Sequence, residues 1–326
     1  MRLQNTDGGD IVSASNPTLT RQQHSAAKKR KKSINWMPYI LIAPAIILIF
    51  CFLFYPVGNV FYYSMQHFNP AKTYENGFAG LDNFTKIFRE DSLFYLSLWV
   101  SLKWVVVEVV LQLICGLGIA LMLNQSFKFR GLFRSAAILP WAISGVVTST
   151  LWSLIFNEQM GVINDLLLRF NWIDHRVAWL AELNTVFPSI VTAELWRGIP
   201  FFTIALLAAM QTIPGDLYES AVVDGANRWK SFIHITMPFL KNTIILTTLL
   251  RAVWEFNNVD LIFIMTNGTG GPVDLTTTLP MYIVKQAIIA QDFGYGSALT
   301  VIGFIILLLF AVSYLKLSGF GKEDQT

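Results

Sequence analysis

Long apolar segments alternate with shorter polar segments along most of the chain. Crossing a bilayer as a helix takes about 20 mostly apolar residues. Each such segment is expected to be helical, because an open strand leaves its backbone groups unpaired in lipid. Six segments are long enough to cross: 39–63, 94–123, 136–156, 185–210, 243–265 and 295–316. The pattern therefore predicts an all-α integral membrane protein with six transmembrane helices.

Polar segments flank this apolar region and divide the chain into three parts. Residues 1–37 are polar and basic, and we expect them to form a disordered cytoplasmic tail. Residues 38–316 form the predicted transmembrane domain. Residues 317–326 form a short C-terminal tail.

The distribution of positive charge predicts which loops face the cytoplasm. Fifteen of the 24 Lys and Arg residues lie in the two tails, with Lys316 counted in the C-terminal one, and in the loops 124–135 and 211–242, whereas six lie in the loops 64–93, 157–184 and 266–294. Cytoplasmic loops are enriched in Lys and Arg. Both termini and the 211–242 loop are therefore predicted to be cytoplasmic.

The composition agrees with lipid as the main solvent. Of the 326 residues, 54% are hydrophobic and 14% are charged, whereas soluble domains carry about 25% charged residues. The net charge of +3 is too small to indicate binding to nucleic acid. Cys51 and Cys115 both lie in apolar segments, and the four histidines are scattered. Neither a disulfide framework nor a metal site is expected.

Several predicted spans carry ionisable residues, each costing about 2.5–3.5 kcal/mol at mid-bilayer on insertion scales. Glu194 and Arg197 are three residues apart, and Arg251 and Glu255 are four apart, so each pair shares a helix face. Two interpretations stay open. The pairs either neutralise one another to hold the bundle together or line a translocation route.

Lys103 and Glu108 in the second span are five residues apart and lie on different helix faces. We therefore expect each of them to find a partner on another helix. Asp260 adds a further charge to the fifth span.

The 211–242 loop is too charged to be a seventh span and is patterned as two short helices. Asp216 is placed to cap the first helix, with Glu219 three residues on, as in a capping box. Gly225 supplies a corner between the helices. Pro238 is expected to end the second helix as the chain re-enters the membrane.

The spacing within this loop resembles the EAA motif of permease subunits of binding-protein-dependent ABC importers. The family pattern is Glu-Ala-Ala, three residues, Gly, nine residues, Ile, one residue and Leu-Pro. This chain has Glu219-Ser220-Ala221, Gly225, Ile235 and Met237-Pro238 at those offsets. Ser stays small enough for close packing, and Met fills a volume similar to that of Leu.

Three further stretches resemble the carbohydrate-import group of these permeases. They are Gly80–Phe84, Gly131–Asn164 and Met265–Ala287. The resemblance thus covers most of residues 38–316, whereas the N-terminal tail is unmatched.

The resemblance implies a fold in which the loop between the fourth and fifth spans is a coupling helix seated in a separate ATPase subunit. The residues it assigns to ATPase coupling are Glu219, Ser220, Ala221, Asp224, Gly225 and Pro238. It also implies a second homologous permease subunit, two copies of the ATPase, an extracytoplasmic solute-binding protein and a sugar substrate. The location implied is the bacterial inner membrane.

The energy source is expected in another polypeptide. This chain has no GxxxxGK[ST] phosphate loop, and Gly319–Glu323 lacks both its spacing and its hydroxyl. We therefore expect ATP and Mg²⁺ in the partner ATPase subunits and no cofactor bound by this chain. No catalytic constellation is visible, so the chain is not expected to be an enzyme.

A sugar-handling site needs aromatic faces for the ring and amide or carboxylate groups for the hydroxyls. The candidate residues in the fourth and fifth spans are Glu194, Trp196, Arg197, Arg251, Trp254, Glu255, Asn257 and Asn258. Trp254 and Asn258 are four apart and are expected on one helix face. Packing within the bundle is the simpler explanation for each residue alone, whereas the cluster favours a polar pathway. A complete substrate site can also lie in the partner permease.

Two other protein classes stay open. A secondary transporter would also carry charges in its spans, but it needs no EAA-spaced loop and often shows inverted repeats, of which none is clear here. A membrane scaffold or sensor with a docking hairpin would explain the spans and the loop. It would not explain paired polar residues in adjacent spans.

Overall fold

The computed structural model describes residues 36–320, and the chain divides into two units, Met1–Leu53 and Phe54–Thr326. The described part of the first unit is helical: α1 (Met37–Ile49) leads into the π-helical turn η1 (Phe50–Phe54). None of the residues of α1 is buried. The basic N-terminal tail and the last residues of the C-terminal tail lie outside the described residues.

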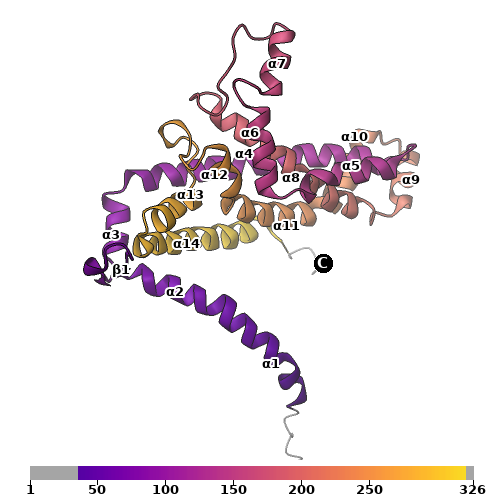
Figure 1. The fold of residues 1–326 in the computed structure, drawn as a ribbon. Coiled ribbons are helices and arrows are strands. Elements are labelled where there is room, and N and C mark those ends of the chain that lie inside the picture. The colour runs from indigo at the N-terminus through magenta and orange to yellow at the C-terminus, as the bar shows by residue number, and fades with distance from the viewer. Residues whose placement is uncertain (1–35, 321–326) are drawn as a thin grey trace, which may run out of the picture. The chain divides into compact units, whose positions relative to one another are not determined.

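The second unit is built almost entirely of helices (Figure 1). Its α-helices are α2 (Tyr55–Ser64), α3 (Asp82–Arg89), α4 (Ser92–Asn124), α5 (Arg130–Ala142), α6 (Gly145–Ile155), α7 (Val162–Arg169), α8 (Val186–Met210), α9 (Gly215–Val223), α10 (Arg228–Ser231), α11 (Met237–Phe256), α12 (Asp260–Met265), α13 (Leu279–Val284) and α14 (Phe293–Ser318). The shorter elements are the π-helical turns η3 (Phe232–Thr236) and η5 (Lys285–Ile289) and the 3₁₀ turns η2 (Thr73–Glu75) and η4 (Pro272–Asp274). Strands β1 (Gln66–His67) and β2 (Gly77–Phe78) pair antiparallel, with Gln66 opposite Phe78.

Five helical segments within residues 36–320 are long and apolar enough to cross a membrane. They are Met37–Ser64, Ser92–Asn124, Val186–Met210, Arg228–Phe256 and Phe293–Ser318. A sixth candidate is the pair α5 and α6, which are bent by 94° relative to one another. The prediction of a helical membrane protein is therefore confirmed, and the count is five spans, or six if the bent pair crosses as one.

The predicted third span, 136–156, is wrong as a continuous helix. It is split between α5 and α6, and the helical hydrogen bonds are interrupted at Ile143 and Ser144. Ser144 is the N-cap of α6, where its hydroxyl accepts a hydrogen bond from the amide of Val147 at 3.4 Å. Pro140, which has no amide hydrogen, lies in the last turn of α5. Apolar composition predicted the crossing length but not the break.

The predicted fifth span, 243–265, is wrong at both ends. The helix begins at Arg228, because the Asn227 side chain caps it by accepting from the amide of Lys230 at 2.8 Å. It ends at Phe256, and α12 starts anew at Asp260. At the end of α11, the Val253 carbonyl accepts a bond from the side-chain Nδ2 of Asn257 at 2.8 Å, and the break at 257–259 follows.

Pro238 does not end a helix, contrary to the prediction. It lies at the start of α11, directly after the π-helical turn η3. The wider turn accommodates the hydrogen bond that proline cannot donate. The same arrangement recurs at Pro56, which follows η1.

The core of the second unit is formed by α4, α8 and α11, with α5 packed on α8, α12 on α6 and α14 on α2 (Figure 1). Helices α4 and α8 lie close together at Gly116. A Cβ there would lie 2.6 Å from the Cβ of Phe202 and 3.1 Å from the amide nitrogen of Thr203. Phe202 itself is fully buried, as is Leu206 one turn further along α8. This close contact fixes the register in which polar side chains of the two helices meet.

Candidate functional site

The segment between α8 and α11 (residues 211–231, called the α9–α10 segment below) folds as a helix, a glycine turn and a second helix. Two backbone bonds close the end of α9: Ala226 N–H donates to the Ala221 carbonyl at 2.8 Å, and Gly225 N–H donates to the Val222 carbonyl at 3.0 Å. Gly225 has φ 77°. This is a Schellman motif, in which glycine favours the left-handed residue after the cap. Gly225 therefore has a backbone role in this chain.

The space around Gly225 is open within residues 36–320. A Cβ added there would meet no heavy atom within 4 Å. A substitution at Gly225 is thus strained by its φ angle and not by a neighbour in this chain. The close approach to another protein surface stays a prediction.

The surface of α9 is exposed and carries both acidic and apolar side chains. Glu219, Ser220 and Asp224 are exposed, and α9 has no buried residue in the described chain. Val222 and Val223 expose 69% and 87% of their surface. Leaving such side chains in water is uncommon in a compact helix pair, so this face is suited to contact with another protein.

The remaining predictions for this segment have a mixed outcome. Asp216 does not cap α9: the helix begins at Gly215, with Pro214 at the N-cap and no side-chain cap bond. Asp216 instead lies in the first turn, where a negative charge favours the helix dipole. The segment is held to the following helix by the hydroxyls of Tyr218 and Thr236, which are 2.9 Å apart.

A buried polar cluster joins α4, α8 and α11. Its members are Glu108 and Gln112 of α4, Glu194 and Arg197 of α8, and Arg251 and Glu255 of α11. We call this set the buried polar cluster.

Arg251 is the central cation of the buried polar cluster. Its Nη2 lies 2.8 Å from Glu194 Oε1 and 2.5 Å from Glu255 Oε1. Its Nε donates to Gln112 Oε1 at 2.7 Å. The Gln112 amide nitrogen in turn donates to Glu108 and Glu255, each at 3.0 Å. Both predicted pairs are therefore formed, and a cross-link between the helices connects them.

Arg197 lies at the edge of the buried polar cluster. It contacts Glu194 through two bonds, Nε to Oε2 and Nη2 to Oε1, each at 2.9 Å. Its side chain keeps 23% of its surface exposed, whereas that of Glu194 has none. A Cβ built on Gly145 would lie 3.2 Å from Arg197 Nη1 and 3.6 Å from Asp260 Oδ2. The first residues of α6 and α12, after the two helix breaks, thus lie beside this guanidinium.

The other predicted pathway residues lie at the surface of this chain. Trp196 exposes 37% and Trp254 exposes 43%, and Trp254 packs its ring against Phe201 at 5.2 Å between centroids. Asn257 is exposed, and Asn258 is half-buried, 3.5 Å from Glu255. The expected shared helix face of Trp254 and Asn258 is wrong, because α11 ends between them.

Lys103 has a partner on another helix, as expected, whereas the hydrogen-bond partner of Glu108 lies on its own helix. Lys103 Nζ lies 3.9 Å from the ring centroid of Phe187 on α8, so its partner is on another helix, as expected. Glu108 has its hydrogen-bond partner, Gln112, on its own helix one turn away. Within residues 36–320, no group of three or more His, Cys, Asp and Glu side chains is arranged to hold a metal ion.

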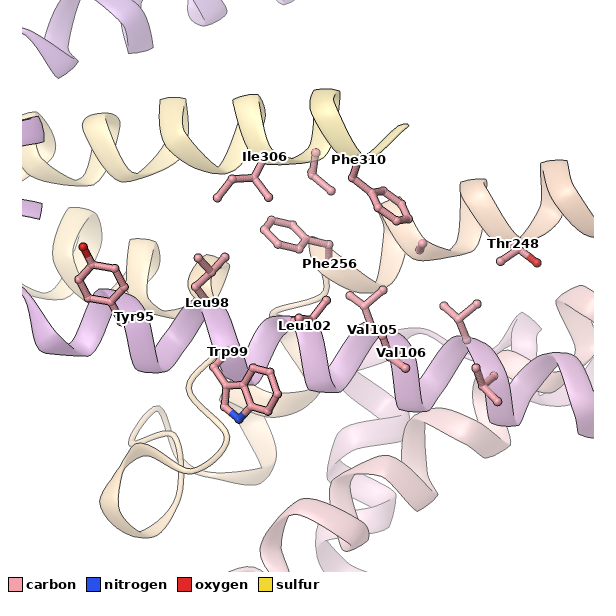
Figure 2. Close-up of a pocket in the computed structure, with 14 residues that line it drawn as sticks. Tyr95, Leu98, Trp99, Leu102, Val105, Val106, Thr248, Phe256, Ile306 and Phe310 are labelled. Atoms are coloured by element: carbon pink, nitrogen blue, oxygen red, sulfur yellow. The ribbon is translucent and has the colours of Figure 1, made fainter. Parts of the chain in front are cut away.

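An apolar groove of about 600 Å³ runs between α4, α11 and α14 (Figure 2). Leu98, Trp99, Val105, Phe256 and Ile306 are among the side chains that line it. Such a lining offers almost no hydrogen bonds to sugar hydroxyls. The groove therefore suits a hydrocarbon chain or another apolar helix, and a sugar site must lie elsewhere.

The loop before α13 is held by one lysine. Lys285 Nζ lies 2.6 Å from the Thr269 carbonyl and 2.7 Å from Asp274 Oδ1. Partial burial raises the pKa of the Asp274 carboxyl, but the bonds from Lys285 and Thr277 and the charge of Lys285 outweigh it, so the pKa lies below its ordinary value. Val273 and Asp274 both have positive φ, at 53° and 57°. The lysine thus holds a strained turn in place.

The known proteins that this chain resembles are transport permeases. The family of binding-protein-dependent transport system inner membrane components matches residues 112–317. This chain belongs to that family. The trehalose/maltose transport system permease protein MalF of Thermococcus litoralis is 33% identical over 290 residues, which cover 87% of this chain and 94% of that protein. The sulfoquinovosyl glycerol transport system permease protein SmoG of Agrobacterium fabrum is 33% identical over 278 residues, covering 85% and 89%.

A solved structure shares the fold of this inner membrane component. It is a bacterial ABC transporter involved in the import of the acidic polysaccharide alginate, with a TM-score of 0.74 and 22% identity over 87% of this chain and 95% of that one. The expectation of an ABC importer permease is therefore confirmed. The chain is a multi-pass transport subunit, and the secondary transporter and scaffold alternatives are not favoured.

Two residues of this permease were missed by the sequence reasoning. Gln112 lies four residues after Glu108 in the second span, so polar spacing on one helix face could have identified it. Asp260 was noted as a charge, but nothing in the sequence placed it at a helix start beside Arg197 and Gly145.

Proposed function

We propose that this permease subunit forms half of the translocation pathway of a carbohydrate importer and receives movement from a separate ATPase through the α9–α10 segment. The main observation behind this proposal is that the surface of α9 is exposed. Gly225, in the left-handed conformation, follows the end of this helix. Glu219, Val222 and Val223 of this surface are left exposed by the described chain, and the predicted spans α8 and α11 continue from the two ends of the α9–α10 segment. A displacement of α9 by a bound protein would therefore move both α8 and α11.

Carbohydrate is the substrate class that the relatives support. The related permeases named above serve trehalose and maltose or sulfoquinovosyl glycerol. In this chain, Trp196 and Trp254 each leave more than a third of their surface exposed, which offers apolar faces for sugar rings. Arg197, Asn257 and Asn258 supply nearby donors and acceptors for hydroxyl groups.

The buried members of the predicted pathway are assigned a different task. Three of these residues expose 5% or less of their surface: Glu194, Arg251 and Glu255. The Arg251 guanidinium forms ion pairs with both carboxylates. We infer that they hold the wall of the pathway in shape and do not contact the sugar. The second wall is supplied by a homologous permease subunit, which would cover the half-exposed tryptophans.

The assembly proposed is two permease subunits, two ATPase subunits that bind ATP and Mg²⁺, and an extracytoplasmic solute-binding protein. Both termini and the α9–α10 segment face the cytoplasm of a bacterial cell, as the distribution of Lys and Arg predicts. A hollow of about 650 Å³, lined by both apolar and polar side chains, among them Asn157, Glu158, Asn267 and Thr269, then opens on the opposite side. It offers hydrogen-bonding groups to the solute-binding protein.

Reconstitution tests this proposal. The complex of both permeases and the ATPase is placed in lipid vesicles with its cognate binding protein, and uptake of labelled maltose, trehalose and other small saccharides is followed with ATP. We expect at least one saccharide to be taken up in an ATP-dependent manner, and histidine and methionine to be excluded. Uptake of an amino acid but of no saccharide would refute the carbohydrate assignment.

A further inference from the structure

We propose that Gln112 is a positioning residue for transport, which makes the span after the α9–α10 segment move as one body with α4 and α8. The inference rests on the proposed coupling role of that segment. It concerns an uncharged side chain on a span that does not adjoin the segment. Gln112 touches neither the proposed substrate residues nor the ATPase-facing surface.

The contacts of Gln112 use both ends of its side chain. Oε1 accepts from Arg251 Nε at 2.7 Å, while Nε2 donates to Glu108 and Glu255 at 3.0 Å each. The residue is fully buried. One amide on α4 therefore satisfies a cation and an anion of α11 at the same time.

An amide suits this position because it can donate and accept at the same time without a charge. The buried polar cluster contains three carboxylates and two guanidinium groups, so the linking side chain must both accept from Arg251 and donate to Glu255. A carboxylate at position 112 would accept from Arg251 but would repel Glu108 and Glu255. An alkyl side chain would leave buried polar atoms unpaired, which costs more than the bonds contribute.

The packing around Gln112 leaves no room for another side chain. A Cβ on Gly198 of α8 would overlap the Gln112 amide and would lie 2.5 Å from Arg251 Nη2. Gly198 thus lets α8 pass directly over the hydrogen-bonded amide. Close packing and hydrogen bonds therefore hold α4, α8 and α11 together at the same place.

The distance of the buried polar cluster from the α9–α10 segment explains why the contacts of Gln112 matter for transmitting movement. Glu194 lies 17 residues before Gln211, about 25 Å along α8, and Arg251 lies 23 residues after Arg228, about 35 Å along a helix. Movement of the α9–α10 segment therefore reaches the cluster through two long helices that could otherwise slide past each other. Gln112 and Arg251 join these helices to α4. At the edge of the cluster, Arg197 lies beside the starts of α6 and α12, where the proposed pathway begins.

The test exchanges the amide of position 112 on α4 with the carboxylate of position 255 on α11. Gln112→Glu adds a fourth carboxylate to the cluster, whereas Gln112→Glu combined with Glu255→Gln restores one amide and three carboxylates with the positions exchanged. The complete complex is reconstituted with its binding protein. Uptake of the saccharide that the wild type transports, ATP hydrolysis and ATPase co-purification are measured for each variant.

We expect Gln112→Glu to retain the ATPase subunits and hydrolyse ATP while saccharide uptake per ATP falls by about tenfold or more, because the added carboxylate repels Glu108 and Glu255 and loosens the link between α4 and α11. The double variant should recover coupled uptake relative to Gln112→Glu, because the repulsion between positions 112 and 255 is removed, although the repulsion from Glu108 keeps it below the wild type. If the complex with Gln112→Glu fails to assemble, the double variant tests the proposal instead. ATP-coupled saccharide uptake by the double variant would then support it. Wild-type uptake per ATP in Gln112→Glu, an assembled but uncoupled double variant, or failure of both to assemble would each overturn it. A wild type without ATP-dependent uptake would instead count against the proposed function itself.

Discussion

The guanidinium of Arg251 on α11 lies 2.8 Å from the carboxylate of Glu194 on α8, although the two residues are 57 positions apart. The contact joins the two spans that enter and leave the α9–α10 segment. Both side chains are buried, so the pair is shielded from water. An ion pair in such a place contributes little net stability compared with apolar packing, but its partial removal is costly. Its value lies in fixing how the two helices meet.

Replacing Arg251 by Leu should therefore destabilise the protein strongly. The change leaves Glu194 and Glu255 buried close together without their shared cation, and breaking a buried pair costs about 3–5 kcal/mol. The measurement is thermal unfolding of the purified protein in detergent. Arg197→Leu is the matched control. It should shift the midpoint less, because Arg197 is partly exposed and Glu194 keeps Arg251. Equal shifts would contradict this account of the cluster.

Several features of the fold could be predicted because they depend on local composition. Length and apolarity predicted the long helices α4, α8 and α14 to within a few residues. The offsets between Glu219 and Gly225 predicted a helix followed by a glycine turn, and the structure has both. These are properties of consecutive residues.

The features that the sequence did not predict depend on contacts between distant segments. The break between α11 and α12 falls at Asn257, Asn258 and Val259, inside a predicted span that is apolar on average, so the mean hydropathy of the span does not locate it. The pairs Glu194–Arg197 and Arg251–Glu255 were visible as helix neighbours. Their cross-link through Gln112 depends on how closely α4 and α8 approach at Gly116 and Gly198.

The loop before α13 should lose stability in acid through Asp274. Its pKa is lowered in the folded protein, mainly because Lys285 and Thr277 outweigh the effect of burial. Stability from this carboxylate is thus fully present above its ordinary pKa and is lost as the pH falls through the lowered value. Hydrogen exchange of residues 266–278 at decreasing pH measures the effect. Asp274→Asn should exchange faster near neutral pH and lose that dependence. A variant with an unchanged acid response would show that another group is responsible.

Membrane orientation can be tested at two exposed positions. Met160 exposes 81% and Val223 exposes 87% of its surface, in the 157–184 loop and in α9 respectively. After Cys51 and Cys115 are replaced by Ala, a single cysteine is introduced at each position in intact cells. A membrane-impermeant maleimide should label Met160→Cys and not Val223→Cys until the cells are opened. The reverse pattern would invert the topology and place the α9–α10 segment outside.

Replacing the exposed acidic residue in the middle of α9, Glu219, should have a moderate effect. Glu219 is exposed in this chain and makes no hydrogen bond that holds α9 together. Glu219→Ala should therefore leave unfolding unchanged and weaken ATPase binding by about 1–3 kcal/mol, the range for one polar contact in an interface. Titration of purified ATPase onto the permease pair measures this. Unaltered affinity would remove Glu219 from the interface.

Gly225→Asp tests the central claim most directly, because Gly319 supplies a matched control in the same chain. Both glycines follow a helix end with positive φ, 77° and 68°, and a Cβ at either would meet nothing within 4 Å. The backbone strain of an Asp is therefore similar, about 1–2 kcal/mol at each position. ATPase co-purification and binding-protein-stimulated ATP hydrolysis are measured for both variants. We predict that Gly225→Asp loses ATPase binding or coupled hydrolysis while Gly319→Asp retains both. Full coupled transport in Gly225→Asp, or equal loss in the two variants, would contradict the proposal that this segment carries movement from the ATPase into the membrane.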